Sequence, residues 1–497
     1  MITSDRRTPS YWIRARWPMP LALFGVLLII LSPAGRAEAL WSFDTLFHAP
    51  SLEERAVQTL SEAIRIRTVN PPGDEARLAR FFAAKLDAVG IENHLVITPS
   101  ENSGSRRAAV WGRVPGTGKR PGIILLSHLD TVPADAREWS VDPFAGRVRN
   151  GFVWGRGALD AKSASVTHLI TLIELAASEE PLKRDVIFLA TPDEETGGRL
   201  GAGWLTANHP ELLDGVGYLL TEGGGIQTAA GVDSNHPEVW GISVTEKSPC
   251  WLALQSHGRA GHSSAPTPDA AVPRLIKALD RIRRVESPIR VVDEVAEMFT
   301  RLAPISPEWE RAELLDLAES LKHNDTFRRR FLDDPGRNAL VRNTISITVL
   351  TGAPKTNVAP LVARAELDAR LLPGESCQSF AASIERLIDE PEIEITEILS
   401  FPARVSSTQT PLFQAIEDVA SGRPRGAAVV PRMVGGFTDA HWFREKGIVA
   451  YGFVPRAISR EEAGRVHGID ERISIDALTE SIRLNIEILR RLDQIDR

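Results

Sequence analysis

Short apolar runs followed by polar residues recur along the chain. The clearest of them, residues 123–126, has four apolar residues between Gly122 and Ser127 and predicts a short strand buried on both faces. Apolar runs at residues 186–191 and 217–221 predict similar strands, and amphipathic or apolar helical patterns lie between the runs. This alternation of strands and helices favours an α/β domain with a mainly parallel sheet covered by helices on both faces.

The hydrophobic pattern changes near residue 240. From there the predicted elements follow the order β-α-β-β-α-β, with strands at residues 251–257, 343–350, 363–371 and 393–399 and helices at residues 269–285 and 379–388. This order favours a separate, smaller α+β domain inserted into the first one. A charged helical segment at residues 291–332 is an addition to the insert, and the alternation of the first domain resumes at residue 411.

The first 39 residues have a pattern of their own. Four arginines lie within residues 1–16, residues 21–31 are almost wholly apolar, and Ala37-Glu38-Ala39 has an A-x-A arrangement. This predicts a secretory signal peptide, with an uncleaved amino-terminal anchor as the alternative. The apolar run is shorter than the ~18–20 residues that span a bilayer comfortably. We therefore expect an exported protein, divided into a signal segment at residues 1–39, a main domain at 40–242 and 405–497, and an insert at 243–404.

Length and composition narrow the class further. A chain of 497 residues exceeds one compact domain, which agrees with two domains. The net charge of −7, without a basic block, argues against nucleic acid as a main partner. The two cysteines, Cys250 and Cys377, cannot form a disulfide framework or a thiolate zinc site. Whether they pair with each other is left open at this stage.

Candidate chemistry begins just past the first apolar strand. His128 and Asp130 follow that strand with one residue between them, at the end where open α/β sheets bind ligands. A carboxylate beside a histidine can accept the second ring N–H and fix the tautomer of a metal ligand. An isolated His-x-Asp is more often a polar strand end, so its interpretation depends on the other acidic and histidine positions.

Several further polar residues occupy comparable positions. Asp160 lies in a glycine-rich turn before a helix, Glu194 and Glu195 follow the second buried strand, Glu222 follows the third, and His467 precedes a glycine near the carboxyl end. Adjacent glutamates usually lie on a solvated surface, but this placement favours burial, which is costly for carboxylates that lack a cation.

These residue types together indicate a metal site. Histidine and carboxylates without cysteine suit zinc or a similar divalent ion in a catalytic site. The set is larger than one open zinc needs, which favours two ions ~3.5–4 Å apart that share a bridging carboxylate. One glutamate that is not a ligand could then act as general base on a water.

With these motifs the chain resembles the aminoacylase/carboxypeptidase family of co-catalytic zinc hydrolases, and within it the carboxypeptidase-S and N-fatty-acyl-amino-acid hydrolase branch. The resemblance covers nearly everything after the signal segment. It implies two zinc ions, for which Co²⁺ or Mn²⁺ could substitute, with one held by His128, Asp160 and Glu222. The other would be held by Asp160, Glu195 and His467, with Asp160 bridging. The resemblance also implies an orienting role for Asp130 on His128.

The same resemblance adds three details to the predicted centre. Glu194 is implied to be the general base and acid. The Asp160–Ala161 peptide is a candidate for the cis form. The branch often has Asp-Glu-Gly-Gly where this chain has Thr221-Glu222-Gly223-Gly224, so the chain departs from the pattern at Thr221.

The insert resembles the lid domain of that family, which commonly mediates dimers. The motif at residues 258–266 implies that His262 hydrogen-bonds the oxyanion; without the resemblance, His262 would be interpreted as a loop residue. Motifs at residues 356–360 and 368–370 imply that Asn357 and Arg370 bind the substrate's carboxylate. The alternative for Arg370 is an ion pair with a neighbouring acid.

The sequence therefore predicts an exported di-zinc hydrolase that cleaves an amide or peptide bond next to a free carboxylate. We expect a carboxypeptidase acting on short peptides, with an N-acyl-amino-acid hydrolase (aminoacylase) as the alternative. An inactive protein that binds amino-acid conjugates is less favoured, because Glu194 and every predicted metal position are present. We expect no nucleic-acid partner, membrane association only with an uncleaved amino terminus, and a homodimer through the lid as an option.

Overall fold

The computed structural model describes residues 49–101, 104, 106–228, 237–424 and 426–495. The predicted signal segment at residues 1–39 lies outside them. The chain divides after Ala49, and the unit that begins at Pro50 contains both predicted domains. Among the helices that the structure describes, none is both long and apolar enough to cross a bilayer.

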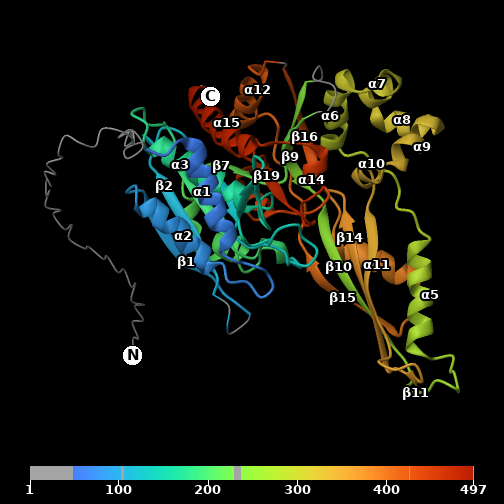
Figure 1. The fold of residues 1–497 in the computed structure, drawn as a ribbon. Coiled ribbons are helices and arrows are strands. Elements are labelled where there is room, and N and C mark those ends of the chain that lie inside the picture. Colours follow the sequence, from blue (N-terminus) through green and yellow to red (C-terminus); the bar gives the residue numbers. More distant parts are fainter. Residues whose placement is uncertain (1–48, 102–103, 105, 229–236, 425, 496–497) are drawn as a thin grey trace, which may run out of the picture. The chain divides into compact units, whose positions relative to one another are not determined.

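A large sheet forms the main domain (Figure 1). Ten strands of the described chain belong to it, and nine of them follow the order β1-β2-β6-β3-β7-β17-β9-β8-β18, with β16 paired to β9. In chain order the strands are β1 (Glu92–Ile97), β2 (Ala108–Val114), β3 (Gly122–His128), β6 (Val186–Thr191), β7 (Val216–Thr221), β8 (Gly225–Gln227), β9 (Glu238–Glu246), β16 (Ala427–Val434), β17 (Val449–Gly452) and β18 (Ala457–Ile458). The β3–β6, β3–β7, β7–β17, β9–β16 and β8–β18 pairs are parallel, which confirms the predicted mainly parallel sheet.

Strand β3 is buried on both faces, as its apolar run predicts. Ile123 and Leu125 join the hydrophobic core on one face of the sheet, whereas Ile124 and Leu126 join the core on the other. This alternation follows from the two-residue period of a strand. A central strand of this kind positions the residues that follow it rigidly.

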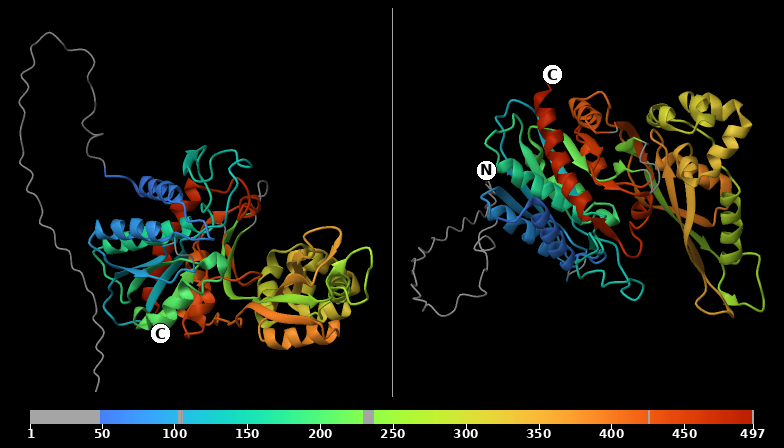
Figure 2. Two further views of the ribbon diagram at one scale, coloured as in Figure 1. Left: turned by 90° about the horizontal axis from the view of Figure 1, so that it is seen from below. Right: turned by 45° about the horizontal axis from the view of Figure 1, so that its top comes forward.

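Helices cover both faces of the large sheet (Figure 2). One face packs against α1 (Leu52–Arg65), α2 (Ala76–Asp87), α3 (Lys162–Ala176), α12 (Pro411–Ser421) and α15 (Ile475–Gln494). The other packs against α4 (Ala202–Asn208) and α13 (Ala440–Arg444). A small sheet of β4 (Arg147–Arg149), β5 (Phe152–Trp154) and β19 (Arg472–Ser474) joins the middle of the chain to its carboxyl-terminal part.

The insert forms a second sheet with the order β12-β14-β10-β15. Its elements are β10 (Ser248–His257), α5 (Ala271–Arg283), β12 (Thr344–Thr351), β14 (Val362–Leu371), α11 (Cys377–Ile388) and β15 (Ile393–Ser400). Alternate residues of β14 are buried, so one face of the sheet packs on α5 and α11. The predicted β-α-β-β-α-β lid is confirmed, with a short added hairpin of β11 (Gly261–His262) and β13 (Val358–Ala359).

The change from the large sheet to the lid sheet differs in detail from the predicted boundary, and the predicted charged segment contacts the main domain. Strand β9 stays in the large sheet through Glu246 and the lid sheet begins at Ser248, so the change of sheet falls beyond the predicted boundary at residue 242. The charged segment forms a group of helices, yellow in Figures 1 and 2: α6 (Asp293–Leu302), α7 (Glu308–Leu315), α8 (Leu317–His323), α9 (Asp325–Asp333) and α10 (Pro335–Leu340). Its own small core includes Val430 and Met433 of β16, so these helices pack on the main domain.

The two cysteines form a disulfide inside the lid. Cys250 on β10 is bonded to Cys377 at the start of α11, with 5.2 Å between the two Cα atoms. Cys250 is fully buried and Cys377 nearly so. The bond therefore ties α11 to β10, one of the two inner strands of the lid sheet.

Candidate active site

The predicted metal ligands meet at one edge of the large sheet. Strands β6, β3 and β7 are neighbours and run in parallel, so their carboxyl ends share that edge. His128 is the last residue of β3, Glu194 and Glu195 follow β6, and Glu222 follows β7. The chain order of the strands thus brings these four side chains together.

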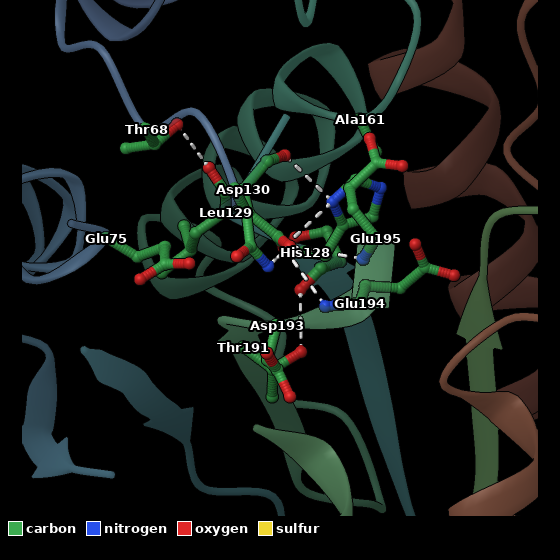
Figure 3. A network of polar contacts seen from close by, with 12 residues as sticks. Thr68, Glu75, His128, Leu129, Asp130, Ala161, Thr191, Asp193, Glu194 and Glu195 are labelled. Atoms are coloured by element: carbon green, nitrogen blue, oxygen red, sulfur yellow. Dashed lines mark hydrogen bonds and ion pairs between the residues drawn. The ribbon is translucent and has the colours of Figure 1, made fainter. Parts of the chain in front are cut away.

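Asp130 organises the centre (Figure 3). Its Oδ1 accepts the backbone N–H of Glu194 at 3.2 Å, and its Oδ2 accepts the backbone N–H of Glu195 at 3.1 Å. Asn70 Nδ2 donates to the same Oδ2 at 2.8 Å. Asp130 therefore fixes the turn that carries both glutamates, a role in addition to the predicted one on His128.

His128 is held in one tautomer. Its Nδ1 donates to the backbone carbonyl of Asp130 at 3.0 Å, and the Asp130 carboxylate is 3.4 Å from the same nitrogen. Nε2 is then the nitrogen with a free lone pair. It lies 2.9 Å from Asp160 Oδ1 and 3.4 Å from Glu222 Oε2. His128 therefore presents its metal-binding nitrogen to the carboxylates.

Asp160 lies between two histidines. Its Oδ1 faces His128, and its Oδ2 is 3.0 Å from His467 Nε2. The peptide between Asp160 and Ala161 is cis, as expected. Glu471 holds this turn, because Glu471 Oε1 accepts the backbone N–H groups of Leu159 at 2.6 Å and Asp160 at 3.0 Å.

His467 completes the cluster from the carboxyl-terminal part of the chain. Its Nε2 is 3.2 Å from Glu195 Oε2, and its side chain is 52 % exposed, at the solvent side of the centre. Hydrogen bonds that the His467 imidazole donates to the carboxylates of Asp160 and Glu195 raise the pKa of His467 to about 10.

Both glutamates of the turn, Glu194 and Glu195, have raised pKa values. Burial raises the pKa of Glu194 well above its usual range, and the charge of Glu222 raises it further. Burial also raises the pKa of Glu195. Four carboxylates (Asp160, Glu194, Glu195 and Glu222) line a single cavity, which is unfavourable unless cations accompany them.

The residues present fit divalent metal ions. Ligand atoms of His128, Asp160 and Glu195 lie within 4.8 Å of one another, and so do those of His128, Glu194 and Glu222. Among the described residues Glu195 Oε1 is buried and has no hydrogen-bond partner. A buried oxygen without a partner, on a carboxylate whose other oxygen is 3.2 Å from His467 Nε2, suits metal coordination. The cluster is therefore a candidate metal centre.

The cavity beside this cluster has a volume of about 470 Å³. One part of its wall carries the acidic cluster. The remainder of the wall is largely apolar or glycine, with His467, Gln227, Thr438, Arg432 and Arg456 as its polar members. The apolar and glycine residues are Gly223, Gly224, Gly225, Ile226, Val434, Gly436, Phe437, Ile458, Ala463 and Val466. A substrate with apolar groups can therefore lie against this wall while its reacting bond faces the metal ligands.

The predicted lid residues are not brought to this cavity within the chain. His262 and Asn357 lie on or beside the β11–β13 hairpin, and His262 lines a different cavity of about 920 Å³. Arg370 forms a bidentate ion pair with Asp368, with Nε at 2.6 Å and Nη2 at 3.0 Å from the carboxylate oxygens. The alternative interpretation of Arg370, a pair with a neighbouring acid, is thus what the structure shows.

A buried polar network behind the centre was not predicted from the sequence. Arg107 Nη1 donates to Asp193 at 2.7 Å, and Nη2 donates to Asn70 Oδ1 at 2.7 Å. Asn70 in turn donates to Asp130, so the network reaches the turn of Glu194 and Glu195 from both ends. Glu471, which holds the turn of Asp160, was not predicted from the sequence either. Their partners are remote in sequence, and no local motif marks them.

The fold and the site define a class of protein. A mainly parallel sheet with a histidine–carboxylate cluster at its carboxyl edge and an inserted lid is the architecture of a metallopeptidase or aminoacylase-type hydrolase. The sequence profile of Peptidase family M20/M25/M40 matches residues 124–491. The chain belongs to this family, and the resemblance drawn from its motifs is confirmed.

Relatives and solved structures agree with this assignment. The chain is 27 % identical over 374 residues to the human N-fatty-acyl-amino acid synthase/hydrolase PM20D1, with 74 % of each chain covered. It is 26 % identical over 373 residues to the Dictyostelium discoideum probable carboxypeptidase S-like 2, with 71 % of this chain and 68 % of the relative covered. The M20 family metallo-carboxypeptidase Sso-CP2 from Sulfolobus solfataricus has the same fold, with a TM-score of 0.67, 19 % identity and coverage of 88 % of this chain and 99 % of its own.

Proposed function

We propose that this protein is an exported di-zinc hydrolase that cleaves an amide bond next to a free carboxylate and acts as a carboxypeptidase on short peptides. One observation supports it most strongly. The two oxygens of Asp160 face the Nε2 atoms of His128 and His467 separately, which suits a carboxylate shared by two ions.

The proposed ligand sets follow this geometry. His128, Asp160 and Glu222 would hold one ion. Asp160, Glu195 and His467 would hold the other. When bound, two divalent ions polarise a substrate carbonyl and lower the pKa of water. Asp130 keeps His128 in the tautomer that the ligand role needs.

Glu194 is the proposed general base and acid. It is buried beside the cluster, it lines the cavity, and its carboxylate makes no hydrogen bond or ion pair with any residue that the structure describes. Burial raises its pKa, which favours a side chain that takes up a proton and then releases it to a leaving amine. Proton transfer of this kind requires a carboxylate that no partner neutralises.

His262 is the proposed hydrogen-bond donor to the oxyanion. It lines another cavity in this chain, so it reaches the reacting bond only if the lid moves or a second copy of the chain supplies it. The short hairpin of β11 and β13 leaves the imidazole exposed, with Ser264 as its hydrogen-bond partner. An exposed histidine on a projecting hairpin supports the proposal of a homodimer through the lid.

An N-acyl-amino-acid hydrolase is the second candidate. It is favoured by the similarity to PM20D1, whose printed name is N-fatty-acyl-amino acid synthase/hydrolase, and by the apolar part of the cavity wall, which includes Ile226, Phe437 and Ile458. An acyl chain and an apolar side chain would both suit such a wall.

Export is supported by two observations. The signal pattern at residues 1–39 predicts it from the sequence. The disulfide between Cys250 and Cys377 supports it independently, because disulfides persist in oxidising compartments.

A matched panel of substrates tests the proposal. Protein lacking residues 1–39 and loaded with zinc is assayed on Z-Gly-Leu, Z-Gly-Leu-amide and N-oleoyl-phenylalanine, with and without a chelator. We expect cleavage of the free acids, loss of activity with the chelator, and little cleavage of the amide. The ratio of kcat/KM values for Z-Gly-Leu and N-oleoyl-phenylalanine decides between carboxypeptidase and acylase. No cleavage of any of the three by protein with two bound zinc ions would contradict the proposed hydrolase.

A further inference from the structure

The added helices α6–α10, the helical group, have no part in the proposed mechanism. In Figure 1 they are the yellow helices beside β16 and above the lid sheet. The chain enters them from lid helix α5 and leaves them into lid strand β12. Their hydrophobic core contains Val430 and Met433 of main-domain strand β16 and also Leu372, which follows lid strand β14. One apolar core therefore includes residues of the main domain, the helical group and the lid.

A charged residue also anchors the helical group on the main domain. Arg301 of α6 pairs with Glu417 of α12 at 2.7 Å, and its Nη1 donates to the Val429 carbonyl of β16 at 3.3 Å. The Arg301 guanidinium also lies over the ring of Phe413, with Cζ 5.3 Å from the ring centroid. Because α12 and β16 both belong to the main domain, α6 is attached to that domain.

Lys247 is the single residue between the large sheet and the lid sheet where the chain first enters the lid. Strand β9 ends at Glu246, and strand β10 begins at Ser248. The backbone N–H of Lys247 donates to the Val434 carbonyl of β16 at 2.9 Å. The backbone is therefore fixed to the main domain at the point where the chain turns into the lid.

The side chain of Lys247 reaches the segment through which the helical group returns to the lid. Its Nζ donates to the Ala339 carbonyl at 3.0 Å, the Arg342 carbonyl at 2.9 Å and Thr344 Oγ1 at 3.1 Å. Ala339 lies in α10, and Thr344 is the first residue of β12. The lysine is 1 % exposed, so these three hydrogen bonds are shielded from water. Hydrogen bonds from a buried charged group are strong and costly to break.

The other connections between the two domains are tied in pairs. The connection that returns from β15 to the main domain lies against the first one, because the Ala403 N–H donates to Ser248 Oγ at 2.6 Å. The two connections between the helical group and the lid lie against each other, because the Arg290 N–H donates to the Val341 carbonyl at 2.8 Å. Lys247 links the first pair of connections to the second.

We propose that Lys247 is a positioning residue that, together with the helical group, holds the lid at a fixed angle to the main domain. The connections at residues 246–248 and 401–406 would by themselves form a hinge, since both pass directly from one sheet to the other. Rotation about this hinge has to break the three hydrogen bonds of a buried ammonium group and to remove Leu372 from its core. This inference goes beyond the proposed function and does not depend on it.

The angle of the lid affects the cavity of the candidate metal ligands, because residues near the hinge contact its wall. The ring centroids of Trp251 on lid strand β10 and of Phe437 are 6.1 Å apart. Glu246, at the end of β9, accepts the backbone N–H of Thr438 at 3.0 Å. Phe437 and Thr438 both line the cavity. A change in the angle of the lid would therefore shift the wall against which a substrate lies.

Spin labels on the two domains measure this angle. The labels are attached to the introduced cysteines of an Ala84→Cys/Ala382→Cys protein, in which one label is on α2 of the main domain and the other on α11 of the lid. Both alanines are exposed, and the two native cysteines are bonded to each other, so labelling is selective. The distance between the labels is measured by double electron–electron resonance on zinc-loaded protein.

Three variants are compared with the labelled wild type: Lys247→Met, Arg301→Gln and Lys322→Met. Lys247→Met removes the ammonium group, and Arg301→Gln weakens the anchor of the helical group while Lys247 stays in place. Lys322 is an exposed lysine of the helical group and gives the matched control. Circular dichroism and metal content verify that each variant is folded and loaded.

We expect one narrow distance distribution for the wild type and for Lys322→Met. In Lys247→Met the distribution should widen or gain a second maximum, and in Arg301→Gln it should widen less, because the apolar core of the helical group remains. A wild-type distribution as wide as that of Lys247→Met, or a Lys247→Met distribution as narrow as the wild type's, would overturn the proposal. If Lys247→Met does not fold, an unchanged distribution in Arg301→Gln would overturn it.

A kinetic measurement then relates the angle to the cavity. In Lys247→Met, kcat/KM on Z-Gly-Leu should fall by about 10- to 100-fold at unchanged metal content, because small displacements of a binding wall misplace the substrate. Lys322→Met should match the wild type. A fall in kcat/KM without a change in the distance distribution would mean that Lys247 acts locally, and would contradict the proposal. If the wild type cleaves none of the panel, the proposed function fails, whereas the distance measurement still tests Lys247.

Discussion

Asp160 Oδ2 lies 3.0 Å from His467 Nε2, although the two residues come from different halves of the main domain. The turn of Asp160 is held by Glu471, only four residues beyond His467, through backbone N–H groups and through Arg156 at 2.7 Å. The carboxyl-terminal segment therefore supplies one candidate metal ligand, His467, and also positions another, Asp160. This coupling means that the centre cannot assemble until the second part of the main domain has docked on the first.

The first prediction concerns Asp160 itself. Asp160→Ala should lower the bound metal from two ions per chain to one or none, because the residue contributes an oxygen to each proposed site. His467→Ala should remove one ion only. Metal content after gel filtration, measured by mass spectrometry, distinguishes the two. Equal metal content in Asp160→Ala and the wild type would contradict the shared ligand.

Glu194→Gln should lower kcat by about 1,000-fold or more while the metal content stays at the wild-type value. The amide keeps the size of the side chain but cannot accept a proton. Glu194 also lies within ligand distance of His128 and Glu222, so the metal measurement is essential. Loss of an ion from Glu194→Gln would show that Glu194 is a ligand, and another base would then be needed.

A mixing experiment decides how His262 reaches the active site. His262→Ala and Glu194→Gln should each be nearly inactive alone. If a second copy supplies His262, an equal mixture that exchanges subunits should recover about a quarter of the wild-type activity, because half of the dimers then carry one intact site of two. An inactive His262→Ala without recovery in the mixture would indicate that the chain's own lid moves. A fully active His262→Ala would exclude the oxyanion role.

Lys247 makes stability depend on pH in the alkaline range. Burial lowers its pKa to about 8 in the folded chain, below its ordinary value of 10.5. The unfolded chain then binds more protons between about pH 8 and 10.5, so this residue's contribution to stability rises with pH across that window. The unfolding free energy of the wild type, relative to Lys247→Met, should rise by about 2 kcal/mol from pH 8 to pH 10 in urea titrations.

The control for this prediction is Lys446→Met, since Lys446 is exposed. Its difference from the wild type should stay constant across the same pH range. Parallel curves for Lys247→Met and the wild type would mean that Lys247, which donates to the carbonyls of Ala339 and Arg342, keeps its ordinary pKa in the fold.

Removal of the lid disulfide should destabilise the lid. The bond closes a loop between residues separated by 127 positions, for which chain entropy predicts a contribution of about 3–5 kcal/mol. The double variant Cys250→Ala/Cys377→Ala should therefore unfold at a lower temperature than the oxidised wild type. Thermal unfolding with and without dithiothreitol measures this. Identical midpoints for the double variant and the oxidised wild type would contradict it.

Much of the active site follows from the sequence by elementary geometry. The apolar run at residues 123–126 and the two runs after it predict neighbouring parallel strands, and parallel strands end at a common edge. The order of the strands therefore predicts by itself that His128, Glu195 and Glu222 lie close together. The lid elements can also be predicted from the sequence. The two-residue period of residues 363–371 and the amphipathic helices around them are local properties of the chain.

The tertiary structure alone decided what depends on contacts between remote segments. Glu471 and Asn70 bind partners 60 or more positions away, so no local pattern marks them. Arg370 and His262 belong to recognisable motifs, yet one is engaged by Asp368 and the other lines a separate cavity. Neither outcome is a local property of the chain, because the energy of a charge depends on what the fold places around it.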